Sequence, residues 1–295
     1  MSRTFSPALD AAIDSEPVKM LDHGFIQVVN YCGIEEDIER AARQSYAADP
    51  QARTPEERRT LLRYMLRHRH NTPFEMCDLT IQAKLPIFVA RQWIRHRTAS
   101  VSELSGRYSI LDAEFYIPEL AQMCAQSATN KQGRAEVLDK TDASDIRGLM
   151  DEHGATAFGL YKYLLEDGPD GYALSRELAR TVLPLSTYTT WTWKVNLHNL
   201  LHFLGLRLDP HAQYEIRVYA DQLWKWVSAW CPVVAEAFID YRLESMTLSR
   251  LEVEALRKLY AHTSRDQLVV ALENAQITMS SRERVEFMDK LAKLR

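Results

Sequence analysis

Residues 78–108 read DLTIQAKLPIFVARQWIRHRTASVSELSGRY, and they contain the clearest strand pattern in the chain. Polar and apolar residues alternate over 78–85, which is the period-two pattern of a strand with one buried face. Pro86 ends that pattern, and a helix is predicted over 87–96. This helix should end near residue 96, because three consecutive residues point about 100° apart on a helix and cannot all face one ligand.

The second half of this segment is unusually basic. It holds several arginines, one histidine and one acid: Arg91, Arg95, His96, Arg97, Glu103 and Arg107. A guanidinium group presents a planar fork of donors that matches phosphate oxygens, so this density predicts a site for a phosphorylated ligand. The alternative is a solvated basic helix end, which the helix dipole favours near a C-terminus. On spacing alone the two interpretations carry similar weight.

Length and composition describe an ordinary globular protein. The chain of 295 residues can bury a sizeable core, and its net charge of -4 argues against general nucleic-acid binding. No apolar run approaches the roughly 18 residues that cross a membrane, and the N-terminus lacks the apolar core of a signal peptide. The cysteines are widely spaced, so we expect reduced thiols in a cytoplasmic protein. They are Cys32, Cys77, Cys124 and Cys231.

Strand patterns are few and helical patterns are many. Residues 1–20 are predicted to form a loosely held leader, and 24–31 a strand rich in aromatic and β-branched residues. Helices are predicted over 34–45 and 55–70, the second with Thr54 as its N-cap and a proline at its first position.

The second half of the chain is predicted to be largely helical. The polar stretch 122–144 is interpreted as a mobile loop or an insertion. Helical spacing predicts four further helices, over 146–166, 172–182, 193–206 and 212–230. Few strands among many helices predict an α+β fold, with a mixed or antiparallel sheet flanked by helices.

Several motifs occur in an order that is specific to one family. The string Arg95-His96-Arg97, followed after seven residues by Ser105-Gly106-Arg107-Tyr108, resembles the signature of the flavin-dependent thymidylate synthases. Further segments are similar to motifs of that family: HNTPFE at 70–75, LARTVLP around Arg180, and Arg207 with HAQ at 211–213. The resemblance divides the chain into a leader at 1–20, a synthase domain at 21–245 and a C-terminal helical extension at 246–295 without an assigned role.

The resemblance implies an enzyme that makes dTMP from dUMP. 5,10-methylenetetrahydrofolate would donate the one-carbon unit and leave as tetrahydrofolate, while tightly bound FAD would carry reducing equivalents from NADPH. No enzyme cysteine would attack the uracil ring, since Cys231 is followed by Pro232 and lacks the Pro-Cys-His context of the conventional synthase. The resemblance also implies a homotetramer whose active sites are shared between subunits, and no nucleic-acid or membrane partner.

By position in these motifs, the resemblance assigns two sets of binding residues. The residues expected to contact FAD are Thr72, Arg95, His96, Arg97, Glu103, Asn196, His198 and His202. The residues expected to hold dUMP are Gln92, Arg95, Glu103, Leu104, Ser105, Gly106, Arg107, Arg180 and Arg207. Arg207 is the expected catalytic residue, because a cation against the uracil edge would favour negative charge on the ring.

Two other functions fit parts of the sequence. A non-catalytic nucleotide- or RNA-binding protein would use the arginine cluster of residues 91–107, and its affinity would fall steeply with salt. A metal-dependent hydrolase would use His70, His198 and His202, of which the last two lie four residues apart on one helix face. No acid or cysteine within that helix completes such a metal site.

Single residues also have structural alternatives. Ser105 could be a nucleophile, but no GxSxG elbow surrounds it, so a hydrogen bond to a ligand is favoured. Arg180 and Arg207 could be partners in structural ion pairs. The tryptophans of the second half are expected in the core or in subunit contacts: Trp191, Trp193, Trp224, Trp226 and Trp230.

Overall fold

The computed structural model describes residues 5–44, 54–128, 133–169, 171–260, 267, 270, 274, 277 and 279–293. Two compact units make up the chain, Met1–Leu243 and Glu244–Arg295. The first unit holds the sheet, the main hydrophobic core and all the residues expected to form the active site.

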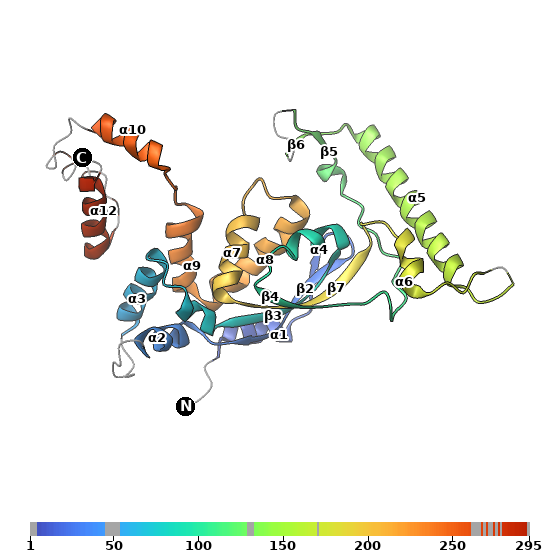
Figure 1. The fold of residues 1–295 in the computed structure, drawn as a ribbon, viewed down its shortest axis with the longest axis horizontal. Helices are drawn as coiled ribbons and strands as arrows, with labels where there is room; N and C mark the ends of the chain where they lie inside the picture. Colours follow the sequence, from blue (N-terminus) through green and yellow to red (C-terminus); the bar gives the residue numbers. More distant parts are fainter. Residues whose placement is uncertain are drawn as a thin grey trace. The chain divides into compact units, whose positions relative to one another are not determined.

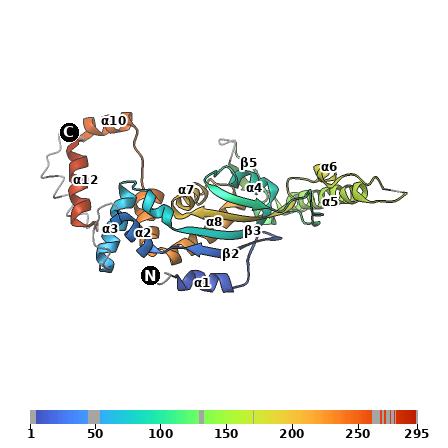
Figure 2. The ribbon, with the colours of Figure 1, turned by 60° about the horizontal axis from the view of Figure 1, so that its bottom comes forward.

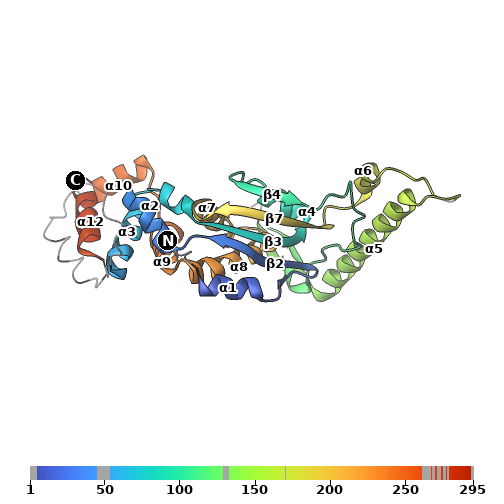
Figure 3. The same cartoon turned by 90° about the horizontal axis from the view of Figure 1, so that it is seen from below.

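A five-stranded antiparallel sheet in the order β1-β2-β3-β7-β4 is the centre of the first unit (Figure 1). The strands are β1 (Val18–Met20), β2 (Gly24–Cys32), β3 (Asp78–Pro86), β4 (Ala99–Glu103) and β7 (Tyr188–Asn196). Figure 3 shows β2, β3, β7 and β4 side by side. The predicted α+β fold with an antiparallel sheet is therefore confirmed.

Strands β3 and β7, which pair at the centre of the sheet, each bury one face. The four apolar residues that the alternation in β3 predicted to be buried are buried: Leu79, Ile81, Ala83 and Leu85. In β7, Trp191 and Trp193 are buried, while Thr192 and Lys194 are exposed. Ile81 pairs with Trp193 across the two strands, so both strands direct their apolar side chains to the same side.

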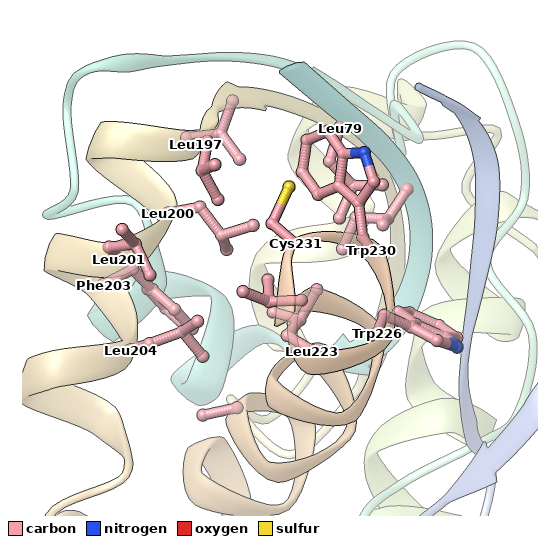
Figure 4. Packing of buried hydrophobic residues seen from close by; sticks show 14 of the residues in the cluster. Leu79, Leu197, Leu200, Leu201, Phe203, Leu204, Leu223, Trp226, Trp230 and Cys231 are labelled. Carbon is pink, nitrogen blue, oxygen red and sulfur yellow. The ribbon is translucent and has the colours of Figure 1, made fainter. Parts of the chain in front are cut away.

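Helices cover the apolar side of the sheet. They are α4 (Ile87–Trp93), α7 (Leu197–Arg207), α8 (Tyr214–Trp230) and α9 (Pro232–Phe238), and Figures 1 and 2 show α4, α7 and α8 beside the strands. The predicted apolar stripe of α8 is buried: Ile216, Tyr219, Leu223, Val227 and Trp230. Figure 4 shows leucines of α7 facing Leu223 and Trp230. Each large side chain buried here contributes about 1.5–3 kcal/mol.

Three helices near the N-terminus also belong to this core. They are α1 (Pro7–Asp14), α2 (Glu35–Gln44) and α3 (Pro55–Arg67). Thr54 and Glu57 form a capping box at the start of α3, which confirms the predicted N-cap, although α3 ends at Arg67 and not at residue 70. The prediction of a loosely held leader is wrong for its described residues, because Leu9 is fully buried and the Ser6 N–H donates to the Tyr31 hydroxyl at 2.6 Å.

The middle of the chain differs from its predicted elements. The stretch 122–144 was interpreted as a mobile loop or an insertion. It begins at the last residue of η2 (Leu120–Gln122), and within it β5 (Cys124–Gln126) pairs with β6 (Arg134–Val137). Helix α5 (Lys140–Leu165) begins earlier than predicted, because the Asp139 carboxylate accepts from the N–H groups of its first turn. The hairpin was missed because β6 is exposed at every residue and so shows no periodic pattern.

Two predicted helices are shorter in the structure. Over 172–182 only α6 (Arg176–Ala179) and η3 (Arg180–Val182) are helical, because the N–H groups of Ala173 and Leu174 donate back to carbonyls at the end of α5. The helix predicted over 193–206 begins only at Leu197, since the residues before it belong to β7. The Asn196 side chain caps α7 by accepting from the Asn199 N–H at 2.9 Å.

The first unit ends in η4 (Ile239–Leu243), a single π-helical turn. In the second unit, α10 (Arg250–Tyr260) and α12 (Ser281–Lys293) are helical, and most of the residues between them lie outside the described part of the chain. Among the described residues, no helix has both the length and the apolar character that a bilayer crossing requires.

Candidate active site

The arginine-histidine triplet lies just beyond the end of α4. Trp93, the last residue of α4, is fully buried and stacks on Phe203 with ring centroids 4.8 Å apart. The Arg95 N–H donates to the Gln92 carbonyl, which is a tightened last turn, and the chain then leaves the helix. Arg95 and Arg97 are exposed. The helix thus ends close to the predicted point, and the triplet extends from its last turn and the following loop.

His96 contacts a second motif that lies far along the chain. The Nε–H group of Arg207 donates to His96 Nε2 at 3.2 Å across 111 residues of sequence. The His96 ring also packs edge-on against Phe203 at 4.8 Å and His202 at 5.9 Å. Burial, with the Arg207 charge and then His202, lowers the pKa of His96 to about 4. His96 is therefore a neutral acceptor at neutral pH, with its proton on Nδ1.

A cavity of about 380 Å³ opens on the exposed side of α7. Its lining combines cationic, imidazole and apolar side chains: Leu66, Arg69, Asn71, His198, Leu201, His202, Gly205, Leu206, Phe238 and Arg242. Thr72 follows Asn71 directly, at the start of η1 (Thr72–Met76). Burial lowers the pKa of His198, an effect that the Glu75 charge opposes. His198 and His202, both expected to contact FAD, thus line one cavity.

A second group of motif residues forms around Gly106. Gly106 is buried, and a Cβ atom there would lie 3.2 Å from Cδ of Arg180. Such a contact is tighter than normal packing, so a glycine is what allows the Arg180 stem to lie against this turn. The Ser105 hydroxyl accepts from the Arg107 N–H at 3.3 Å, and the Arg107 guanidinium lies 3.2 Å from the Glu177 carboxylate. The structure thus brings Ser105, Gly106 and Arg107 to Arg180.

Strand β4 connects His96 of the first group to Gly106 of the second group along the chain. Ala99 at its start pairs with Val195, and Glu103 at its end pairs with Trp191. At about 3.3 Å per residue, the strand separates its ends by about 13 Å. The Glu103 carboxylate accepts from the Thr189 hydroxyl at 2.9 Å, and Leu104, which follows the strand, is partly exposed. Within one chain the residues expected at the site therefore form two neighbouring groups.

Some residues beside these groups were not expected from the sequence. One of them is Gln213, the last residue of the HAQ segment, which accepts a hydrogen bond from the Gln92 amide. The HAQ motif was the signal in the sequence that could have predicted this residue. Arg69 and Arg242 also line the cavity, and neither belongs to a motif that the sequence analysis assigned to the site. In the described part of the chain, no three His, Cys, Asp or Glu side chains are arranged to hold a metal ion.

Comparisons with known proteins agree on one family. The family described as thymidylate synthase complementing protein matches residues 27–233. The flavin-dependent thymidylate synthase of Gluconobacter oxydans is 48% identical over 262 residues, which are 89% of this chain and 84% of that protein. The enzyme of the same description from Ruegeria pomeroyi is 46% identical over 293 residues, covering 99% of this chain and 93% of that protein.

A solved structure has the same fold. The UMP/dUMP methylase PolB from Streptomyces cacaoi, crystallised with 5-Br dUMP, superimposes with a TM-score of 0.69 at 29% identity, over 78% of this chain and all of that one. The fold of this chain is therefore that of a known enzyme. The chain is a member of the flavin-dependent thymidylate synthases, a family of methyltransferases.

Proposed function

We propose that this chain converts dUMP to dTMP, with 5,10-methylenetetrahydrofolate as one-carbon donor and FAD reduced by NADPH as hydride carrier. Tetrahydrofolate is then the by-product. The names of the relatives and the 5-Br dUMP bound to the solved neighbour support this assignment. The observation that carries it is the contact of Arg207 with His96, because two motifs of the family, far apart in the sequence, meet there beside a cavity.

The side chains around the α7 cavity fit FAD. A flavin dinucleotide carries flat apolar rings and an anionic diphosphate, so its site needs apolar walls together with cationic or hydrogen-bonding groups. Leu201 and Phe238 provide such walls, and His198, His202 and Arg242 provide the polar groups. When bound and reduced, FAD supplies the hydride that the methyl group requires. The protein binds and orients the reactants for this step.

The group around Gly106 fits the phosphate of dUMP. Arg107 belongs to the turn at Gly106, the stem of Arg180 from η3 (Arg180–Val182) lies against that turn, and both arginines are exposed. The ion pair of Arg107 with Glu177 joins two half-exposed side chains, so it contributes at most about 1 kcal/mol. Bidentate pairing of a guanidinium with phosphate is stronger, and a bound nucleotide can therefore displace Glu177 from Arg107.

Arg207 has the environment of a catalytic cation. It is partly buried, and burial lowers its pKa from the usual value, yet an arginine stays protonated throughout the working pH range. Its Nε–H is held by the neutral His96 ring, which adds no competing negative charge. A guanidinium group held in this way stabilises negative charge that develops on a uracil ring beside it.

Two of the cysteines, Cys77 and Cys231, are unsuited to act as nucleophiles. Cys77 and Cys231 are fully buried, and burial raises the pKa of each thiol far above its usual value. The thiolate is the nucleophilic form, so neither side chain is reactive at neutral pH. Cys231 also lies at the junction of α8 and α9, within the apolar core that Figure 4 shows.

We also propose a homotetramer with shared active sites. Within one chain His96 precedes β4 and Gly106 follows it, and we propose that residues of a neighbouring subunit complete the site around one ligand set. Helix α5 supports this, because Ile146, Leu149, Met150 and Leu160 are partly or largely exposed on it. Mass measurement by light scattering tests the assembly. A cytoplasmic location stays a prediction.

The experiment for this function is the visible spectrum of freshly purified protein, followed by turnover. We expect a yellow protein that releases FAD on heating, and dTMP formation when dUMP, methylenetetrahydrofolate and NADPH are added. Because the solved neighbour is a UMP/dUMP methylase, UMP should be assayed beside dUMP. A colourless preparation that does not take up added FAD would exclude the proposed chemistry.

A further inference from the structure

We infer that Thr189 is a positioning residue for dUMP binding, because its buried hydroxyl group holds the carboxylate of Glu103 in the orientation that the nucleotide requires. Glu103 is an expected contact of dUMP and FAD, so the inference rests on the proposed function. It adds a residue that none of the motifs assigned to the site contains. Thr189 lies in β7, inside the sheet, and Glu103 is the last residue of the edge strand β4.

Thr189 is a polar residue in an otherwise apolar row of β7. Side chains two residues apart on a strand face the same side, and the others in this row are buried: Trp191, Trp193 and Val195. Thr189 itself is only 4% exposed, and its partner on β3 is the fully buried Leu85. A hydroxyl group buried in such surroundings needs a hydrogen-bond partner, whereas a valine side chain has nearly the same shape without that need. Packing alone would therefore favour an apolar residue here, so the hydroxyl group requires another explanation.

The partner of this hydroxyl group is the Glu103 carboxylate. The Thr189 hydroxyl donates to Glu103 Oε1 at 2.9 Å. The pairing of β4 with β7 places Glu103 opposite Trp191, so Thr189 is its diagonal neighbour, within reach of a long side chain. The backbone beyond Glu103 is fixed as well, because the Leu104 N–H donates to the Thr190 carbonyl at 2.9 Å. Strand β7 thus holds both the backbone and the side chain at the end of β4.

The hydrogen bond leaves Glu103 able to bind a ligand. Glu103 is exposed, and within the described part of the chain the Thr189 hydroxyl is the only donor to its carboxylate. An ionised carboxylate has two acceptor oxygens, so Oε2 stays open to the N–H or O–H groups of dUMP. A glutamate side chain that is free to rotate must be ordered when the ligand binds, which weakens binding. Because Thr189 fixes this side chain in advance, dUMP binding avoids that loss of entropy.

The test uses two variants that separate packing from hydrogen bonding. Thr189→Val keeps the shape of the side chain and removes the hydroxyl group, whereas Thr189→Ser keeps the hydroxyl group and removes a buried methyl group. Thr192→Val is the matched control, because Thr192 is an exposed threonine on the opposite face of the same strand. The dissociation constant of dUMP is measured by titration calorimetry on the full-length protein saturated with FAD, and stability is measured by urea unfolding. Glu103→Ala, alone and combined with Thr189→Val, completes a double-mutant cycle.

Thr189→Val should bind dUMP about fivefold to thirtyfold more weakly without loss of stability, which is the factor expected when a glutamate side chain loses its order. Thr189→Ser should bind dUMP within about twofold of the wild type although it is less stable, since a buried methyl group is lost. Thr192→Val should match the wild type, and adding Thr189→Val to Glu103→Ala should weaken binding no further.

A dUMP affinity that falls in step with stability in both Thr189 variants would overturn the inference, because the role of Thr189 would then be structural. Equal weakening by Thr189→Val with and without the Glu103 side chain would also overturn it. So would an unchanged dUMP affinity in Thr189→Val, and the proposed function would stand in that case. Failure of the FAD-loaded wild type to bind dUMP would reject the proposed function, and the inference with it.

Discussion

Replacing Arg207 by alanine should harm the chemical step far more than replacing Ser105. Arg207 is partly buried and its Nε–H is held at 3.2 Å by a neutral imidazole. A guanidinium group in such a site lowers the pKa of the uracil N3–H by about 1–3 units, and each unit corresponds to about 1.4 kcal/mol. The loss of Arg207 should therefore slow the reaction by about tenfold to a thousandfold, toward the limit of detection.

Ser105 should contribute much less to the reaction rate than Arg207. Its hydroxyl already accepts from the Arg107 N–H at 3.3 Å, and no base lies beside it in the motif. A neutral hydrogen bond to a ligand contributes about 0.5–1.5 kcal/mol, so Ser105→Ala should lose about twofold to tenfold, mainly in dUMP binding. This difference in expected size separates a positioning hydroxyl from a catalytic cation.

The assay is single-turnover oxidation of the reduced flavin, with dUMP and methylenetetrahydrofolate both present. The FAD spectrum should persist in both variants, which shows that the flavin site is intact. Arg207→Ala should leave the reduced flavin almost unreacted, and Ser105→Ala should show a measurable rate that rises with dUMP concentration. Complete loss in Ser105→Ala beside a near-normal rate in Arg207→Ala would refute the reasoning and make Ser105 the candidate nucleophile.

Three further predictions concern charge, packing and domain organisation. His96 should stay neutral down to about pH 5 and take up a proton with a pKa of about 4, and Arg207→Ala should raise that pKa in nitrogen NMR titrations. The pKa of His96 in the folded protein lies below the ordinary 6.5, so the stability that His96 contributes is present above pH 6.5 and is lost as the pH falls toward 4. A His96 pKa near 6.5 in the wild type would contradict this prediction. Gly24→Ala should destabilise the protein by about 1–3 kcal/mol in urea unfolding, because a Cβ atom would meet the Met20 carbonyl oxygen at 2.7 Å, whereas Gly148→Ala, with no atom within 4 Å, should stabilise by up to about 1 kcal/mol. Removal of residues 246–295 should leave flavin oxidation within about twofold of the full chain, since no expected ligand contact lies there; a soluble truncated tetramer without turnover would show that this extension takes part in catalysis.

Elements with one strong local pattern were predictable. The alternation in β3, the capping box at Thr54 and the apolar stripe of α8 each describe a half-buried element, and the structure has all three. β7 was partly misread, because the leucines of α7 begin directly after it and their helical spacing was extended backwards over Trp193. The alternation of buried Trp193 and Val195 with exposed Thr192 and Lys194 is nevertheless the period of a strand.

The site could be predicted only in part. The helix end before the triplet follows from geometry, since consecutive residues diverge on a helix. The contact between His96 and Arg207 joins residues 111 apart, and no local spacing contains it, so only the family resemblance related the two motifs. Arg69 and Arg242 were missed because their part in the cavity depends on a left-handed residue and a π-helical turn, which composition does not reveal.

The central claim is tested most directly by product formation from dUMP. Purified protein freed of flavin is incubated with dUMP, methylenetetrahydrofolate and NADPH, with and without added FAD, and dTMP is measured by mass spectrometry. The account predicts that dTMP and tetrahydrofolate form in equal amounts when FAD is present, and that no dTMP forms without it. Formation of dTMP at the same rate in the absence of flavin, or none in its presence, would contradict the account.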